Sequence, residues 1–138
     1  MRGVARWDGE AWRSLGSGLL PDYDAYGTCT RPWGSDLIVG GRFAQVGGVS
    51  ASNIARWDGA SWHALGSGLD DEVYALAEYG GDLIVGGDFT RAGGIPAAGV
   101  ARWNGSSWSA MGDNAIYVGV LRVVEGRLFA AGTFLVRR

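Results

Sequence analysis

Acidic side chains in this chain gather in the segments that precede two stretches rich in β-forming residues. The candidate ligand-binding residues are five acids and one arginine: Asp22, Asp24, Asp70, Asp71, Glu72 and Arg91. If these loops lie together at one end of the fold, their acids would bind a cation, a basic peptide or a polyol. The alternative is a set of solvated loops on an acidic protein. Calcium is the weaker hypothesis, because no Asp-x-Asp-x-Asp-Gly loop is present and three consecutive acids do not define a coordination shell.

Nucleophilic and metal-binding residues are scarce. The chain has one cysteine, Cys29, and one histidine, His63, so neither an intrachain disulfide nor a histidine-based metal cluster can form within it. A nucleophilic Cys29 would need a neighbouring base, and we expect His63 in a different, outer strand. The segment 66–71 begins like a nucleotide-binding loop but lacks the third glycine and the following helix. We therefore predict no enzyme, no cofactor and no metal.

The composition is typical of a folded domain that neither binds nucleic acid nor spans a membrane. The chain has 138 residues, of which 47% are hydrophobic and 19% charged, which suits one ordinary domain. The net charge of −2 gives no basic surface for nucleic acid, and no apolar run is long enough to cross a bilayer. No signal peptide is expected in this chain, because its first residues enter a structural motif at once. The compartment stays open, with a secreted or cell-surface bacterial protein as one hypothesis.

Three motifs recur in a fixed order along the chain. An Ala-Arg-Trp motif followed by Asp-Gly or Asn-Gly occurs three times, with spacings of 50 and 46 residues, and alternates with a Leu-Ile-Val-Gly-Gly motif whose third copy is degraded. A Leu-Gly-Ser-Gly-Leu segment follows the first two copies of the tryptophan motif. Repeats of this length are typical of propeller blades. The residues that we expect to form the repeat core are Trp7, Trp12, Trp57, Trp62, Trp103, Trp108, Gly40, Gly41, Gly86, Gly87, Phe43, Phe89 and Phe134.

Each repeat is predicted to form four short antiparallel strands, A to D, because β-forming stretches alternate with glycine-rich turns. The chain is expected to open with strands C–D at about 3–16 and to continue with two complete sets at about 24–66 and 72–111. It would end with strands A–B at about 115–135. No stretch of useful length shows helical periodicity.

Each predicted C–D hairpin carries two tryptophans five residues apart. A two-residue loop, which Asp-Gly and Asn-Gly favour as a primed turn, would place Trp57 opposite Ala60. A four-residue loop would place Trp57 opposite Trp62. Both registers put the two rings on one face of the sheet, where we expect them to fill the wedge between neighbouring sheets. Stacking on a ligand is the alternative role.

These motifs resemble the kelch type of β-propeller blade. They are more similar still to a class of bacterial propeller repeats with Ala-Arg-Trp-Asp-Gly-x-x-Trp and Leu-Ile-Val-Gly-Gly-x-Phe, and the resemblance covers nearly the whole chain. It implies an all-β fold of four-stranded antiparallel blades and a role as an interaction or ligand-binding platform. The copper chemistry of galactose-oxidase-like enzymes is not carried over, because the single His63 cannot supply their ligands.

The strand count predicts a homo-oligomer. Residues 1–138 would form one half-propeller domain with three blades' worth of strands, and propellers have four to eight blades. Two copies would give a six-bladed homodimer in which strands A–B of each chain are completed by C–D of the other. A fragment of a larger extracellular propeller protein is the alternative.

We therefore predict a non-catalytic binding or structural module. Its ligand, a small molecule or a protein, is not identified by the sequence. The alternative is a lectin-like carbohydrate-binding propeller that uses exposed aromatic side chains, Trp33, Tyr23 and Tyr26, together with the loop acids.

Overall fold

The computed structural model describes residues 3–18 and 25–135. Its described part is all-β, with antiparallel pairing throughout and no helix, which confirms the all-β part of the predicted fold class. Two four-stranded sheets share one strand order. The first four-stranded sheet has the order β3 (Tyr26–Trp33), β4 (Asp36–Arg42), β7 (Ile54–Trp57) and β8 (Trp62–Ala64). The second four-stranded sheet repeats it with β9 (Val73–Tyr79), β10 (Asp82–Gly87), β13 (Val100–Trp103) and β14 (Trp108–Ala110).

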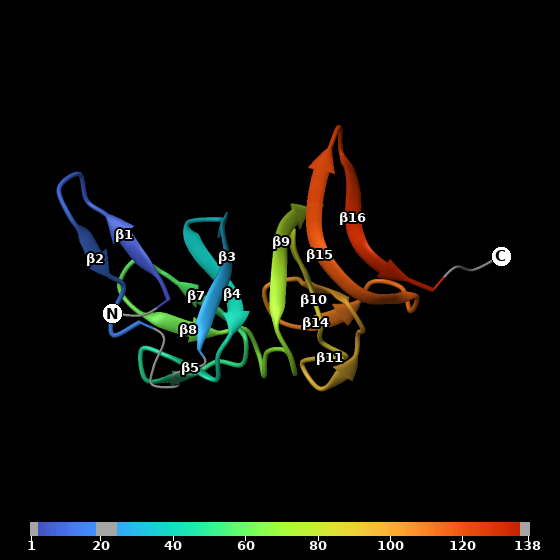
Figure 1. Ribbon diagram of the computed structural model, residues 1–138, viewed down its shortest axis with the longest axis horizontal. Helices are drawn as coiled ribbons and strands as arrows, with labels where there is room; N and C mark the ends of the chain where they lie inside the picture. Colours follow the sequence, from blue (N-terminus) through green and yellow to red (C-terminus); the bar gives the residue numbers. More distant parts are fainter. Residues whose placement is uncertain (1–2, 19–24, 136–138) are drawn as a thin grey trace.

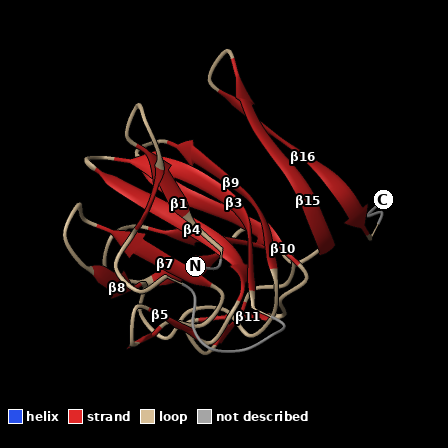
Figure 2. Cartoon of the chain, turned by 60° about the vertical axis from the view of Figure 1, so that its left-hand side comes forward, coloured by secondary structure: helices blue, strands red, loops and turns tan. Residues whose placement is uncertain are grey.

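A two-stranded hairpin stands at each end of this pair of sheets (Figure 1). The amino-terminal hairpin consists of β1 (Ala5–Trp7) and β2 (Trp12–Ser14), and the carboxy-terminal hairpin of β15 (Ala115–Val124) and β16 (Arg127–Phe134). Two small hairpins, β5 (Gln45–Val46) with β6 (Val49–Ser50) and β11 (Arg91–Ala92) with β12 (Ile95–Pro96), lie on the loop side below the sheets. Figure 2 shows the carboxy-terminal hairpin standing apart from the other strands along most of its length.

Three separate apolar cores fill the three spaces between successive sheets. The first joins Leu15, after β2, to Val39 and Trp62 of the first four-stranded sheet. The second lies between the two four-stranded sheets, and the third joins the second sheet to the carboxy-terminal hairpin. Each sheet therefore buries one face against the sheet before it and the other against the sheet after it, where such a sheet exists in the chain.

Glycines in the second strand of each four-stranded sheet allow this close approach. A Cβ added at Gly40 would lie 2.5 Å from Cγ1 of Val73, and one at Gly86 would lie 2.7 Å from Cγ1 of Val118. A Cβ added at the next glycine, Gly87, would lie 2.1 Å from the backbone carbonyl oxygen of Glu72. A side chain at Gly40 or Gly86 would force neighbouring sheets apart, and one at Gly87 would disturb the pairing of β9 with β10.

The tryptophan hairpins use four-residue loops. Trp57 pairs directly with Trp62, and the same register recurs in the other two hairpins. The turn is not of the primed type that the Asp-Gly dipeptide favours, since Asp58 does not have a positive φ. Instead, Asp58 Oδ1 accepts hydrogen bonds from the N–H groups of Ala60 and Ser61, each at 2.8 Å, which caps a wider loop. The ring centroids of Trp57 and Trp62 lie 5.1 Å apart.

Candidate functional site

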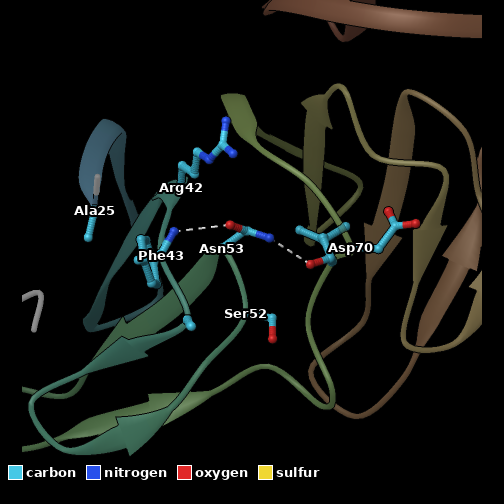
Figure 3. A pocket seen from close by; sticks show the side chains of 8 residues that line it. Ala25, Arg42, Phe43, Ser52, Asn53 and Asp70 are labelled. Carbon is cyan, nitrogen blue, oxygen red and sulfur yellow. Dashed lines mark hydrogen bonds between the residues drawn. The ribbon is translucent and has the colours of Figure 1, made fainter. Parts of the chain in front are cut away.

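A hollow of about 340 Å³ opens among the loops that follow β4, β6 and β8, and it contains one of the predicted acids, Asp70 (Figure 3). Asn53 lies at its centre in a left-handed conformation, with a φ of 65°. The Oδ1 atom of Asn53 accepts a hydrogen bond from Phe43 N at 3.0 Å, and its Nδ2 donates one to Leu69 O at 2.8 Å. The amide therefore ties together three loops, and its role in this hollow is structural.

Asp70 organises the loop that carries Arg91. Its oxygens accept hydrogen bonds from Thr90 N at 2.8 Å, Thr90 Oγ1 at 2.7 Å and Arg91 N at 3.0 Å. Burial raises the pKa of this carboxyl, but the hydrogen bonds from Arg91 and Thr90 outweigh it and leave the pKa lowered. The Arg91 guanidinium turns to its own loop and donates from Nη1 to Gly94 O at 3.0 Å. Asp70 therefore holds the loop that carries Arg91, and the Arg91 side chain stabilises that same loop.

Glu72 is buried, with 6% of its surface exposed, and it lies in a cluster with two tyrosines. The Tyr74 hydroxyl is 2.7 Å from Glu72 Oε2 and 3.0 Å from Asp88 Oδ2, so its single proton is shared between two carboxylates. Hydrogen bonding to Glu72 is the main cause that raises the pKa of Tyr74, and it also raises the pKa of Tyr26. Asp71 Oδ1 caps this turn by accepting from Glu72 N at 2.7 Å.

Asp70, Asp71 and Glu72 each serve a different local network, and Asp22 and Asp24 lie outside the described residues. Among the part of the chain that the structure describes, no group of three acids, histidines or cysteines is arranged to hold a metal ion.

Cys29 and His63 lie on strands at opposite edges of the first four-stranded sheet. Burial raises the pKa of the Cys29 thiol, which disfavours the reactive thiolate. The His63 ring contacts a hairpin turn instead, with Nε2 at 2.7 Å from Asp58 Oδ2. The two residues therefore do not form a nucleophile–base pair.

Tryptophans join each four-stranded sheet to the sheet before it. Trp62 Nε1 donates to Leu15 O, and Trp108 Nε1 donates to Leu65 O, both at 2.8 Å. Trp12 occupies the same place in the amino-terminal hairpin, but it is 63% exposed. Its indole N–H has no acceptor among residues 3–18 and 25–135. Trp7 beside it is 53% exposed, so this pair fills no wedge within the single chain.

The carboxy-terminal hairpin leaves the opposite face open. Phe129 stands at the position of Ile38 and Ile84, which are both fully buried against the following sheet, yet Phe129 is 54% exposed. Phe134, the third repeat of the buried Phe43 and Phe89, is also exposed. Other exposed apolar residues of this hairpin are Ile116, Val120, Val123 and Val124. Within the described residues, β16 pairs with β15 alone and β1 with β2 alone.

The three residues that sequence reasoning missed are Asn53, Tyr74 and Asp88. Asn53 had a visible signal, because it stands where the other two repeats have Gly3 and Gly99, both with positive φ. Tyr74 and Asp88 had none, since their contact depends on the pairing of β9 with β10.

No protein-family model, curated protein or solved structure matches this chain. None of the described residues belongs to a helix that could span a membrane.

Proposed function

We propose that this protein is a non-catalytic binding or structural module that assembles as a six-bladed β-propeller from two copies. In this assembly, β15 and β16 of each chain form the inner half of a blade, and β1 and β2 of the other chain form its outer half. The observation that carries the proposal is the match between the two ends: one hairpin corresponds to the first half of the four-stranded pattern and the other to the second half.

The exposed side chains support the same assembly. The amino-terminal hairpin exposes Trp7 and Trp12, whose counterparts in both four-stranded sheets contact a preceding sheet. The carboxy-terminal hairpin is a sheet that lacks its outer strands, and its exposed Phe129 corresponds to residues that contact a following sheet. Joining the hairpins covers both sets at once and removes two unpaired strand edges, which are otherwise sites of aggregation.

Two copies are the smallest number that closes a ring of ordinary size. Each chain has two complete sheets and two halves, so two chains give six sheets, within the usual range of propellers. The two junctions between the chains of such a ring are identical by twofold symmetry. The loops of β5–β6 and β11–β12, with the hollow around Asn53, would occur at one end of the ring in each copy.

A binding platform is better supported than a sugar-binding site built on exposed aromatic residues. The indole of Trp33 already donates from Nε1 to Gly81 O at 3.1 Å, and Tyr26 interacts with Glu72. Tyr23 lies outside the described residues.

An edge proline tests the assembly with little effect on the single chain. Ala5 corresponds to Ala55, whose N–H faces β4 in the ladder, so the N–H of Ala5 faces outward from β1. Ala5→Pro removes that donor and is expected to give a folded monomer, as proline is tolerated at an unpaired edge. Ala5→Gly keeps the N–H and is expected to remain dimeric. Dimers of equal affinity from both variants, measured by analytical ultracentrifugation, would contradict pairing through β1.

A further inference from the structure

The internal repeats define how a second copy would dock, if the proposed dimer is correct. In both complete sheets, a glycine of the second strand meets a valine of the next sheet: Gly40 meets Val73, and Gly86 meets Val118. The pairing is strictly repeated, because Val73 lies opposite Gly87 and Val118 lies opposite Gly132 in their own sheets.

The glycine and the valine are both replaced at the junction that remains, between the carboxy-terminal hairpin of one chain and the first four-stranded sheet of a second copy. The third copy of the glycine is Ala131, in β16. The third copy of the valine is Gly27, because it lies opposite Gly41 just as Val73 lies opposite Gly87. Where the second strand gains a methyl group, the facing strand has lost its whole side chain. Within one chain these residues belong to the first sheet and the last hairpin, so they can meet only between copies.

We infer that β1 of a second copy lies against β16 with its Arg6 opposite Phe129, and that Ala131 packs against Gly27 of that copy. The register follows from the internal sheets, where Ile38 pairs with Arg56 and Ile84 with Arg102. The added methyl group of Ala131 is matched by the missing side chain of Gly27, and a second copy supplies this match without a change of register. Gly27 is also close to its own chain, where an added Cβ would lie 3.2 Å from Gly3 O, so the test below compares two variants that both carry valine at this position.

The same register gives an acceptor to the unpaired tryptophan. Trp62 and Trp108 donate to the carbonyls of Leu15 and Leu65, and the third residue of that series is Met111. Met111 packs at the margin of the core between the second sheet and the carboxy-terminal hairpin. Trp12 of the second copy would therefore donate from Nε1 to Met111 O and cover Met111.

The ion pair that joins the second and third strands of the internal sheets has a different arrangement at this junction. In the second sheet Arg102 pairs with Asp82, with Nε and Oδ2 2.6 Å apart, but the residue that replaces Asp82 is Arg127. A carboxylate is present two residues earlier, in the hairpin turn. Glu125 stands at the position of Gly80, where an added Cβ would lie 3.2 Å from Arg102 Nη2. In the dimer, Glu125 is the acidic side chain placed to face Arg6 of the second copy and to offset the repulsion from Arg127.

A pair of engineered cysteines tests the register directly. Phe129 and Arg6 would form a non-hydrogen-bonded pair, whose Cα atoms lie roughly 4.5 Å apart in antiparallel sheets and within disulfide range. In a Cys29→Ala background, Arg6→Cys with Phe129→Cys is expected to give a covalent dimer under oxidised glutathione, seen on a non-reducing denaturing gel. Arg6→Cys with Ala130→Cys is the control, because these side chains would point to opposite faces.

The outcomes separate the register from the dimer. If the native mass is that of two copies but the Phe129 pair fails to cross-link, or the Ala130 pair cross-links equally well, the register is wrong and the dimer stands. If the native protein is a monomer, the proposed function itself fails.

A size exchange tests the packing of Ala131 on Gly27. Gly27→Val alone is expected to weaken dimerisation roughly tenfold or more, because the added branches meet the methyl group of Ala131. Adding Ala131→Gly restores the Gly–Val pair of the internal sheets and is expected to recover the affinity. A double variant that dimerises no better than Gly27→Val would overturn this contact, and circular dichroism of both variants checks that the fold is kept.

Discussion

Replacing Arg127 with aspartate is predicted to strengthen the dimer. The change installs at the junction the ion pair that joins Asp82 to Arg102 in the second four-stranded sheet, and an equivalent pair joins β4 to β7 in the first. In the wild-type junction, Arg127 faces Arg6 of the second copy, so two like charges stand in diagonal cross-strand positions. The substitution removes that repulsion and adds an attraction with the same partner.

The expected gain can be estimated from the exposure of the internal pairs. Their side chains are partly exposed, with Arg102 and Asp82 at 31% and 28%, so solvent screens the attraction within each pair. Such pairs contribute roughly 0.2–1 kcal/mol, and opposed like charges cost a similar amount. One junction therefore gains about 1 kcal/mol, and the two junctions of a twofold ring about 2 kcal/mol, which is roughly a 30-fold lower Kd.

Sedimentation velocity over a dilution series measures this change in Kd. The gain should shrink in 1 M salt, where the Debye length falls from about 8 Å to about 3 Å. The matched control is an Arg6→Ala background, in which most of the effect of Arg127→Asp should disappear. An equal gain with and without Arg6, or no change in Kd at all, would refute the placement of these two residues.

Four further predictions concern individual side chains. Trp108→Phe leaves the buried carbonyl of Leu65 without its donor and should cost about 1–3 kcal/mol. At roughly 3–4 °C per kcal/mol for a chain of this size, differential scanning calorimetry should show a Tm lower by about 3–10 °C. Trp12→Phe should leave the fold of a monomeric variant unaffected, yet weaken the wild-type dimer; an undiminished dimer affinity would speak against its contact with Met111. Because burial raises the pKa of Cys29, iodoacetamide at pH 8 should modify it more slowly than free glutathione, and a faster reaction would show an activated thiol. Hydrogen bonds from Arg13 and from backbone N–H groups lower the pKa of Asp8 from 3.8 to about 2, so its stabilising effect should be complete above about pH 4 and lost as the pH falls towards 2. Urea unfolding of wild type and Asp8→Ala across that range should show their difference in stability vanish at the acid end, and a constant difference would contradict it.

The fold class could be predicted because the sequence repeats its own motifs. The alternation of Ala-Arg-Trp and Leu-Ile-Val-Gly-Gly segments indicated antiparallel strands of the observed order, and the five-residue spacing of Trp57 and Trp62 placed both rings on one face. Turn type was harder to predict. The Asp-Gly dipeptide favours a primed two-residue turn, whereas the side chain of Asp58 caps a four-residue loop.

The contacts of the candidate acids were harder to predict from the sequence, because neighbouring acids have different partners. Asp70 and Glu72 are separated by one residue, yet one caps a loop and the other is buried against Tyr74. Thr90, the partner of Asp70, lies 20 residues further along the chain, and a single sequence does not report such a contact. The exposure of Trp12 and Phe129 was easier to anticipate, because each lies in a hairpin that holds only half of the four-stranded pattern.

Sedimentation equilibrium of the unmodified chain at several concentrations tests the half-ring most directly. A ring closed by two copies predicts one species of twice 14.5 kDa, that is about 29 kDa, which does not grow as the concentration rises. A mass of 14.5 kDa at every concentration, or masses that climb past two copies, would contradict closure of the ring by a second chain.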